Sequence, residues 1–286
     1  MVLDKGIIDR KRGFFIVFIA LLLGFINMKY TFFPNWDDNL YLYEFKKTLV
    51  DHDLWETIGI FFLHQNNPTE LRTYGLSKVI QLLIYVIFGE YSVKVQMFLI
   101  PFLYVLSSIL IYLIGKTLRI ADNYLKYITI IYIFFPSVYQ IRIFHYYSYL
   151  CIPFYIYLIY LYCNICFIQK KVKTKRDFCL NIIASIFLIF IMVFTGESLL
   201  AFEGITMAIL AIYSLLYRKE KVTFIKYLMD GFLLVLYVMV AVLLYHFYAI
   251  KLDRFQIREI NILNSIRLFA KSVLLGISQF FFISLP

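Results

Sequence analysis

Two adjacent carboxylates, Asp37 and Asp38, are the residues of this chain best suited to acid–base chemistry. They stand in the segment 33–39 (FPNWDDN), shortly after an uncharged apolar stretch at 14–28. Adjacent carboxylates at a membrane surface repel each other and are costly to desolvate, so a functional use is expected. A carboxylate in that place can take the proton from an acceptor hydroxyl as the hydroxyl attacks a sugar carbon. We therefore predict that one of the pair is a catalytic base, with Asp37 preferred because it lies nearer the helix end.

A second set of polar residues could bind the substrate of such a reaction. Arginine, lysine and histidine can stabilise a leaving phosphate, and the short turns that carry them should meet at one rim of a compact helix bundle. Arg142, His145 and Tyr149 are spaced to share one helical face, and Glu203 follows Glu197 by one to two turns. The predicted substrate-binding residues are His64, Arg72, Arg142, His145, Glu197, Arg254 and Arg258.

Neither a metal site nor a cofactor is predicted from these residues. Hard oxygen ligands suit Mg²⁺ or Mn²⁺, but two adjacent carboxylates are too few to argue for a bound divalent cation. Cys163 and Cys166 form a C-x-x-C in an apolar segment with no second pair, which argues against a zinc or redox site.

The composition identifies the elements that must hold these residues. Hydrophobic residues make up 62% of the chain and charged residues 16%, against roughly 25% charged in soluble domains. The apolar residues form blocks close to the roughly 20 residues that cross a bilayer. We predict an all-α fold, a polytopic transmembrane helix bundle that forms a single domain over 1–286 with about seven or eight spanning helices. The expected ranges are 13–32, 95–115, 127–141, 148–168, 178–195, 199–217 and 228–250, with a last helix opening near 272.

The formal charge of +10 is distributed unevenly along these helices. The N-terminal segment and the short loops at 116–126, 170–176 and 218–226 carry more than half of the 28 lysines and arginines. By the positive-inside rule these segments face the cytoplasm, so Asp37 and Asp38 face outward. The basic surplus is thus an orientation signal, helped by anionic membrane lipids, and no nucleic-acid partner is expected. The predicted location is a bacterial plasma membrane, as a multi-pass integral protein with a cytoplasmic N-terminus.

The largest extramembrane element is the outer loop at 33–94. Within it, Leu76 to Phe88 is apolar but only about 13 residues long, which is short for a span. If this segment did span, most of the loop cations would face outward, against the positive-inside rule. We therefore predict an amphipathic helix near 71–88 that lies on the outer leaflet and ends at Gly89.

Several short motifs in this order resemble the GT-C membrane glycosyltransferases. In that family a cytoplasmic N-terminus and one helix precede an acidic pair that opens a large outer loop. The likeness continues through the segments 67–76 (NPTELRTYGL), 87–92 (IFGEYS) and 112–118 (YLIGKTL), and then through Phe135-Pro136 and Gly196-Glu197.

The resemblance implies transfer of a sugar from a polyprenyl-phosphate donor to a glycan, lipid or protein hydroxyl at the outer face. Asp37 or Asp38 would match the position of the family's catalytic base, and Arg72 and Arg142 would contact the donor phosphate. Members of the family usually continue with further helices, so we expect a short or C-terminally truncated member.

Three other functions fit part of the pattern. A surface-polysaccharide polymerase also has many helices and charged outer loops, and the cations between Lys251 and Lys271 could hold two pyrophosphate lipids. A transporter of lipid-linked glycans would place ionisable residues at mid-membrane depth, whereas the charges of this chain are expected at the ends of its helices. A non-catalytic assembly subunit would use none of these groups for chemistry.

Overall fold

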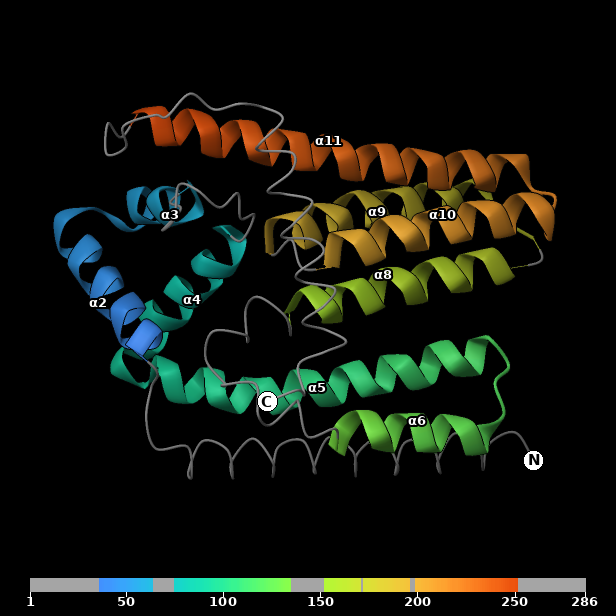
Figure 1. The fold of residues 1–286 in the computed structure, drawn as a ribbon, viewed down its shortest axis with the longest axis horizontal. Helices are drawn as coiled ribbons and strands as arrows, with labels where there is room; N and C mark the ends of the chain where they lie inside the picture. The colour runs from blue at the N-terminus through green and yellow to red at the C-terminus, as the bar shows by residue number, and fades with distance from the viewer. Residues whose placement is uncertain (1–35, 64–74, 135–151, 171, 196–198, 252–286) are drawn as a thin grey trace, which may run out of the picture. The chain divides into compact units, whose positions relative to one another are not determined.

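Helices account for every regular element that the structure describes. The computed structural model describes residues 36–63, 75–134, 152–170, 172–195 and 199–251 (Figure 1). The helices are α2 (Trp36–Asp51), α3 (Leu54–Leu63), α4 (Gly75–Phe88), the 3₁₀ helix η1 (Gly89–Tyr91), α5 (Ser92–Thr117), α6 (Asp122–Phe134), α8 (Ile152–Gln169), α9 (Lys175–Thr195), α10 (Leu200–Leu216) and α11 (Lys221–Lys251). The all-helical prediction is confirmed for these residues.

The described helices belong to two compact units. One unit contains α3, the start of α4 and the four helices α8 to α11. The other contains most of α2, the remainder of α4, η1, α5 and α6. The prediction of a single transmembrane domain for the whole chain stays a prediction.

The helices α8 to α11 form a bundle with its own core. In this bundle α8 packs on α9, and α11 packs on both α9 and α10 (Figure 1). Phe62 of α3 stacks on Phe194 of α9, with ring centroids 5.4 Å apart. The Ser77 hydroxyl at the start of α4 donates a hydrogen bond to the Thr195 carbonyl oxygen at 2.7 Å. Fully or almost fully buried members of the core are Tyr160, Ile189, Met192, Val193, Met207, Tyr227 and Ala241.

The other unit is organised around the contact of α5 with α6. Leu125 of α6 is 1% exposed, and a Cβ atom added to Gly115 of α5 would lie 3.2 Å from its Cγ. Glycine at position 115 therefore allows the two helices to approach closely. Gly89 has φ of +55°, a left-handed conformation that favours glycine, and it follows α4 directly.

Beside its apolar core, the α8–α11 bundle buries a number of polar side chains and exposes many apolar ones. Large apolar side chains on α10 and α11 are exposed, among them Ile205, Ile209, Leu228, Phe232, Val235 and Met239. Polar and charged side chains are buried, among them Asn164, Asn181, Ser185, Glu203, Ser214, Thr223, Lys226 and Asp230. A helix bundle in water shows the reverse pattern, with its apolar stripe facing the core. The observed pattern suits a hydrocarbon solvent, where ionisable groups face the bundle interior.

Among the described residues, four helical segments are long and apolar enough to cross a membrane. They are Gly75–Gln96, Ile152–Gln169, Lys175–Thr195 and Lys221–Leu244. These segments fit the predicted membrane protein. The first of them overlaps the predicted surface helix at 71–88, so the position of that helix on the outer leaflet, like the count of seven or eight spans, stays a prediction.

The predicted helix ranges need two corrections. The helix expected at 127–141 begins at Asp122, and the helix expected at 228–250 begins at Lys221. In the second case the charged residues before position 228 suggested a loop, whereas in the structure they start the helix and Lys226 lies inside the bundle. The helices predicted at 13–32 and from 272 lie outside the described residues.

Candidate functional site

A lysine–aspartate pair inside the α8–α11 bundle is the polar centre of this unit. Lys226 Nζ lies 2.7 Å from Asp230 Oδ2, one turn further along α11, and the two side chains are only 2% and 6% exposed. The ammonium also donates to Asn164 Oδ1 of α8 at 2.6 Å and to Ser185 Oγ of α9 at 2.9 Å. Because an ammonium has three N–H donors, these three oxygens satisfy all of them. The buried charge is thus both paired and hydrogen-bonded, as a low-dielectric interior requires.

Two tyrosines enclose the pair. The Tyr160 hydroxyl of α8 donates to Asp230 Oδ2 at 2.7 Å, and the Tyr227 hydroxyl of α11 donates to the Asn164 carbonyl oxygen at 3.3 Å. Lys226 Nζ lies 4.3 Å from the centroid of the Tyr227 ring and 5.8 Å from that of Tyr160. Ring faces attract a cation, more strongly when the cation is desolvated. Both tyrosines therefore shield Lys226, and Tyr160 also orients Asp230.

Two partners that α8 and α9 contribute to the pair stand at mid-length of their helices. Tyr160 is the ninth of the 18 residues of α8, and Ser185 is the eleventh of the 21 residues of α9. The pair itself lies in the first third of α11, where Lys226 is the sixth and Asp230 the tenth of 31 residues. Lys226, predicted to lie in a loop before position 228, is buried in the bundle, and partners on α8 and α9 make the burial of its charge tolerable.

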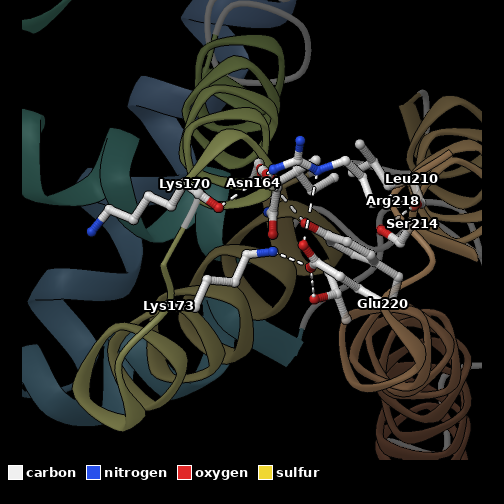
Figure 2. A network of polar contacts seen from close by, with 10 residues as sticks. Asn164, Lys170, Lys173, Leu210, Ser214, Arg218 and Glu220 are labelled. Carbon is white, nitrogen blue, oxygen red and sulfur yellow. Dashed lines mark hydrogen bonds and ion pairs between the residues drawn. The ribbon is translucent and has the colours of Figure 1, made fainter.

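A second polar network closes the end of the bundle where α8 meets α9 and α10 meets α11 (Figure 2). Glu220 pairs with Lys173 of the α8–α9 connection and accepts a hydrogen bond from Thr223 Oγ1 at 2.7 Å. Arg218 Nη2 donates to the Ile168 carbonyl oxygen near the end of α8 at 2.9 Å. Arg218 Nε lies 3.8 Å from Glu220 Oε1, so the two connections are joined through charge (Figure 2).

The pKa of Glu220 lies below its ordinary value. Burial acts to raise this pKa, but hydrogen bonds from Lys173 and Thr223, together with the charges of Lys173 and Arg218, lower it by more. Glu220 is therefore held as an anion, and it keeps both connections attached to the same end of the bundle.

The predicted catalytic pair opens α2. Asp37 and Asp38 are the second and third residues of that helix, so both stand in its first turn. The predicted substrate-binding residues lie outside the described residues, and their roles stay predictions; they are His64, Arg72, Arg142, His145, Glu197, Arg254 and Arg258. Glu203, which follows Glu197 by one to two turns, lies within the described residues and is fully buried.

The polar centre has to be interpreted from its own chemistry. No known protein family, protein of known function or solved structure matches this chain. Within the described ranges, no group of three or more histidine, cysteine, aspartate or glutamate side chains is arranged to hold a metal ion. The groups that are present, an ammonium, a carboxylate and two phenols, can pair charges, donate hydrogen bonds and transfer protons.

Sequence reasoning missed this centre although the sequence contains a signal for it. Glu220, Thr223, Lys226 or Tyr227, and Asp230 recur every three or four residues, the spacing of one helical face. This polar stripe continues into an apolar helix, where an ionisable residue is by default a candidate for function. Placing the helix start at 228 separated Lys226 from Asp230 and hid the stripe.

Proposed function

We propose that the chain is a membrane glycosyltransferase that moves a sugar from a polyprenyl-phosphate donor to a glycan, lipid or protein acceptor. The observation that carries this proposal is the position of Asp37 and Asp38 in the first turn of α2. The positive end of a helix dipole favours a negative carboxylate, which is the form that a general base needs. One carboxylate takes the proton of the acceptor hydroxyl as its oxygen attacks the anomeric carbon, and polyprenyl phosphate leaves with the bonding electrons.

The leaving phosphate needs positive groups close to it. Arg72 and Arg142 are proposed as contacts of the donor phosphate, because a guanidinium can bind two phosphate oxygens at once. His64, His145, Glu197, Arg254 and Arg258 are proposed to complete the substrate site. The reaction would take place at the outer face of a bacterial plasma membrane, in a bundle of seven or eight spanning helices with a cytoplasmic N-terminus.

The helix α4 is proposed to lie at the membrane surface beside this site. Its second half exposes the apolar residues Leu83, Val86, Ile87 and Phe88, while Ser77 and Gln81 in its first half are buried. A helix with exposed apolar residues suits contact with lipid, and a lipid-linked donor would reach the site along it.

The proposal is tested with the purified protein in lipid vesicles. The vesicles receive a panel of polyprenyl-phosphate sugars and candidate acceptors, and the release of polyprenyl phosphate is measured. We expect release by the wild-type protein and none by a variant with both Asp37→Asn and Asp38→Asn. Equal release by the wild type and the double variant would overturn the proposal.

The Lys226–Asp230 pair favours a second function, movement of a lipid-linked glycan across the membrane. Transporters keep ionisable residues at mid-membrane depth, and two partners of this pair on α8 and α9, Tyr160 and Ser185, stand at mid-length of those helices. The test uses vesicles that contain the protein and a fluorescent lipid-linked glycan. If the protein is a transporter, the glycan should cross the membrane with the wild type and with Asp37→Asn, but not with the double variant Lys226→Gln/Asp230→Asn. Movement no faster than in protein-free vesicles would exclude this function.

A further inference from the structure

Four exposed cations stand at one end of the α8–α11 bundle without a carboxylate partner. This end carries the α8–α9 and α10–α11 connections, which Glu220 and Arg218 join (Figure 2). The two carboxylates of these connections are already paired, Asp177 with Lys170 at 2.7 Å and Glu220 with Lys173. The remaining cations are exposed and form no ion pair with the residues that the structure describes; they are Lys175, Arg176, Lys219 and Lys221. We call these four residues the cation surface.

Lys219 occupies a backbone position that glycine usually takes. Its φ is +54°, in the left-handed region, and the backbone N–H of Glu220 donates to the Ser214 carbonyl oxygen at 3.0 Å. This hydrogen bond closes the C-terminus of α10 in the manner of a Schellman motif, where the left-handed residue is usually glycine because a Cβ atom is strained there. A residue held in a strained conformation is a reason to look for a function at that position.

The same replacement of glycine by a basic residue is found at the end of α5. Arg119 has φ of +62°, and the Ile120 N–H donates to the Gly115 carbonyl oxygen at 2.9 Å. Among the described residues, Arg119 and Lys219 are the two non-glycine residues with positive φ, and both are basic. Gly89, in the predicted outer loop, has φ of +55° and keeps the ordinary residue. Both basic residues lie in connections predicted to face the cytoplasm, so the basic side chain goes with the predicted side of the membrane.

The other members of the cation surface oppose the helix dipole. Lys175 and Arg176 are the first two residues of α9, and Lys221 is the first residue of α11. The N-terminus of a helix carries partial positive charge, so a cation there is unfavourable. Local helix stability therefore does not explain these three cations. The positive-inside rule does not explain the strain at Lys219 either, because that rule needs cations in a short loop but not at a strained position.

The side chains beside the cation surface suit the interface between a membrane and water. Tyr217 is 76% exposed, and its ring stacks on that of Tyr213 with centroids 5.4 Å apart. Leu216 and Val222 are also exposed. Tyrosine is enriched where a membrane meets water, and cations at that level attract anionic lipids. A partner with an anionic head and an apolar body would match both kinds of side chain.

We propose that the cation surface binds the phosphate groups of anionic phospholipids. The ammonium and guanidinium groups donate hydrogen bonds to the phosphate oxygens, and the acyl chains lie along the exposed apolar side chains of α10 and α11. Phosphate binding offsets the strain at Lys219. The inference goes beyond the two proposed functions and depends on neither, since it involves no sugar and no lipid-linked donor.

The test measures which lipid lies beside position 217 in the full chain. Trp36 and Trp55 are replaced by phenylalanine, Tyr217→Trp is the reporter, and the vesicles contain equal amounts of phosphatidylcholine and phosphatidylglycerol. Either the phosphatidylglycerol or the phosphatidylcholine carries brominated acyl chains, which quench tryptophan. We expect stronger quenching by brominated phosphatidylglycerol. Lys219→Gln should reduce the preference for this lipid by up to about fivefold, the scale for one cation near an anionic membrane surface. Equal quenching of the reporter by the two lipids would overturn the proposal.

Three further variants separate lipid binding from folding and from net charge. Lys219→Gly should raise the thermal unfolding midpoint in detergent, because glycine relieves the left-handed conformation, and it should still reduce the preference for phosphatidylglycerol. Lys219→Arg should keep the preference. Lys47→Gln, which removes an exposed lysine of α2, should also keep it. An unchanged preference in Lys219→Gly, or a loss in Lys47→Gln as large as in Lys219→Gln, would refute binding at the cation surface.

Discussion

Lys226 and Asp230 neutralise each other from consecutive turns of one helix, with Nζ and Oδ2 2.7 Å apart. Because both side chains are buried, each charge is tolerated only while the other is present. The attraction between two buried charges offsets little more than the free energy of their desolvation. Removing one of them is strongly destabilising, because the other charge stays buried without a partner. Replacing one member of the pair should therefore affect the stability of the bundle more than replacing both.

Lys226→Met should lower the stability of the bundle by about 3–5 kcal/mol, because it leaves Asp230 buried without a cation. The measurement is the thermal unfolding midpoint in detergent. The double variant Lys226→Met/Asp230→Leu should recover most of the loss, since no charge remains inside. Lys221→Met, which changes an exposed lysine on the first turn of the same helix, is the control and should have little effect. A double variant as unstable as the single one would contradict this account.

The ion pair of Glu220 should make the bundle less stable in acid. The pKa of Glu220 is lowered in the folded protein, so its contribution is present above the unfolded pKa and disappears as pH falls through the folded pKa. Both side chains of the Lys173–Glu220 pair are partly exposed, so we expect a contribution of roughly 0.2–1 kcal/mol. Unfolding midpoints measured over acidic pH should fall more steeply for the wild type than for Glu220→Gln. Parallel curves would show that Glu220 does not act through its charge.

Gly115→Ala should destabilise the α5–α6 contact by roughly 1–3 kcal/mol, because the new methyl group meets the side chain of Leu125. Gly231→Ala in α11 is the matched control, since nothing lies within 4 Å of a Cβ atom there. That second change should stabilise the protein by about 0.5–1 kcal/mol, as alanine is the better helix former. Thermal unfolding of the two variants should thus move in opposite directions.

The exposed apolar face of α11 should contact lipid. In a background where both native tryptophans, Trp36 and Trp55, are replaced by phenylalanine, Phe232→Trp should be quenched strongly by brominated lipids, since Phe232 is 70% exposed. Phe194→Trp should be quenched weakly, because Phe194 is 2% exposed in the bundle core. Equal quenching of both tryptophans would place the face of α11 away from lipid.

Single substitutions of the acidic pair should separate the proposed base from its neighbour. Asp37→Asn is expected to reduce release of polyprenyl phosphate by roughly 10²-fold or more, the usual scale for a lost general base. Asp38→Asn should reduce the release of polyprenyl phosphate by less than Asp37→Asn does. The KM for the substrate is measured for both variants as a second readout. Full activity in both single variants would mean that neither carboxylate is the base.

The apolar blocks were enough to predict most of the helices. The expected ranges 178–195 and 199–217 agree closely with α9 and α10, because long uninterrupted apolar segments leave few alternatives. The start of α11 was placed too late, since lysines before position 228 suggested a solvated loop. What allows Lys226 inside the bundle is Asn164 from α8 and Ser185 from α9, and such partners over long sequence distances do not show in local composition.

The candidate sites also depend on packing that local sequence does not show. The sequence predicts Asp37 and Asp38 beyond the end of a helix, in the outer loop at 33–94, whereas in the structure both stand in the first turn of α2. The burial of Glu203 does not follow from sequence, since an acidic residue in the first turn of a helix is usually an exposed one. Its burial depends on the packing of α10 against α11.

The position of lysine and aspartate on the same helix bears on how the protein is made. A segment that enters the bilayer with its own counter-ion carries no net charge at that level, whether or not α8 and α9 have already arrived. During biosynthesis α11 could thus leave the translocon before its partners are in place. Asn164 and Ser185 would then act later, by selecting the rotation of α11 about its axis that brings Lys226 between them.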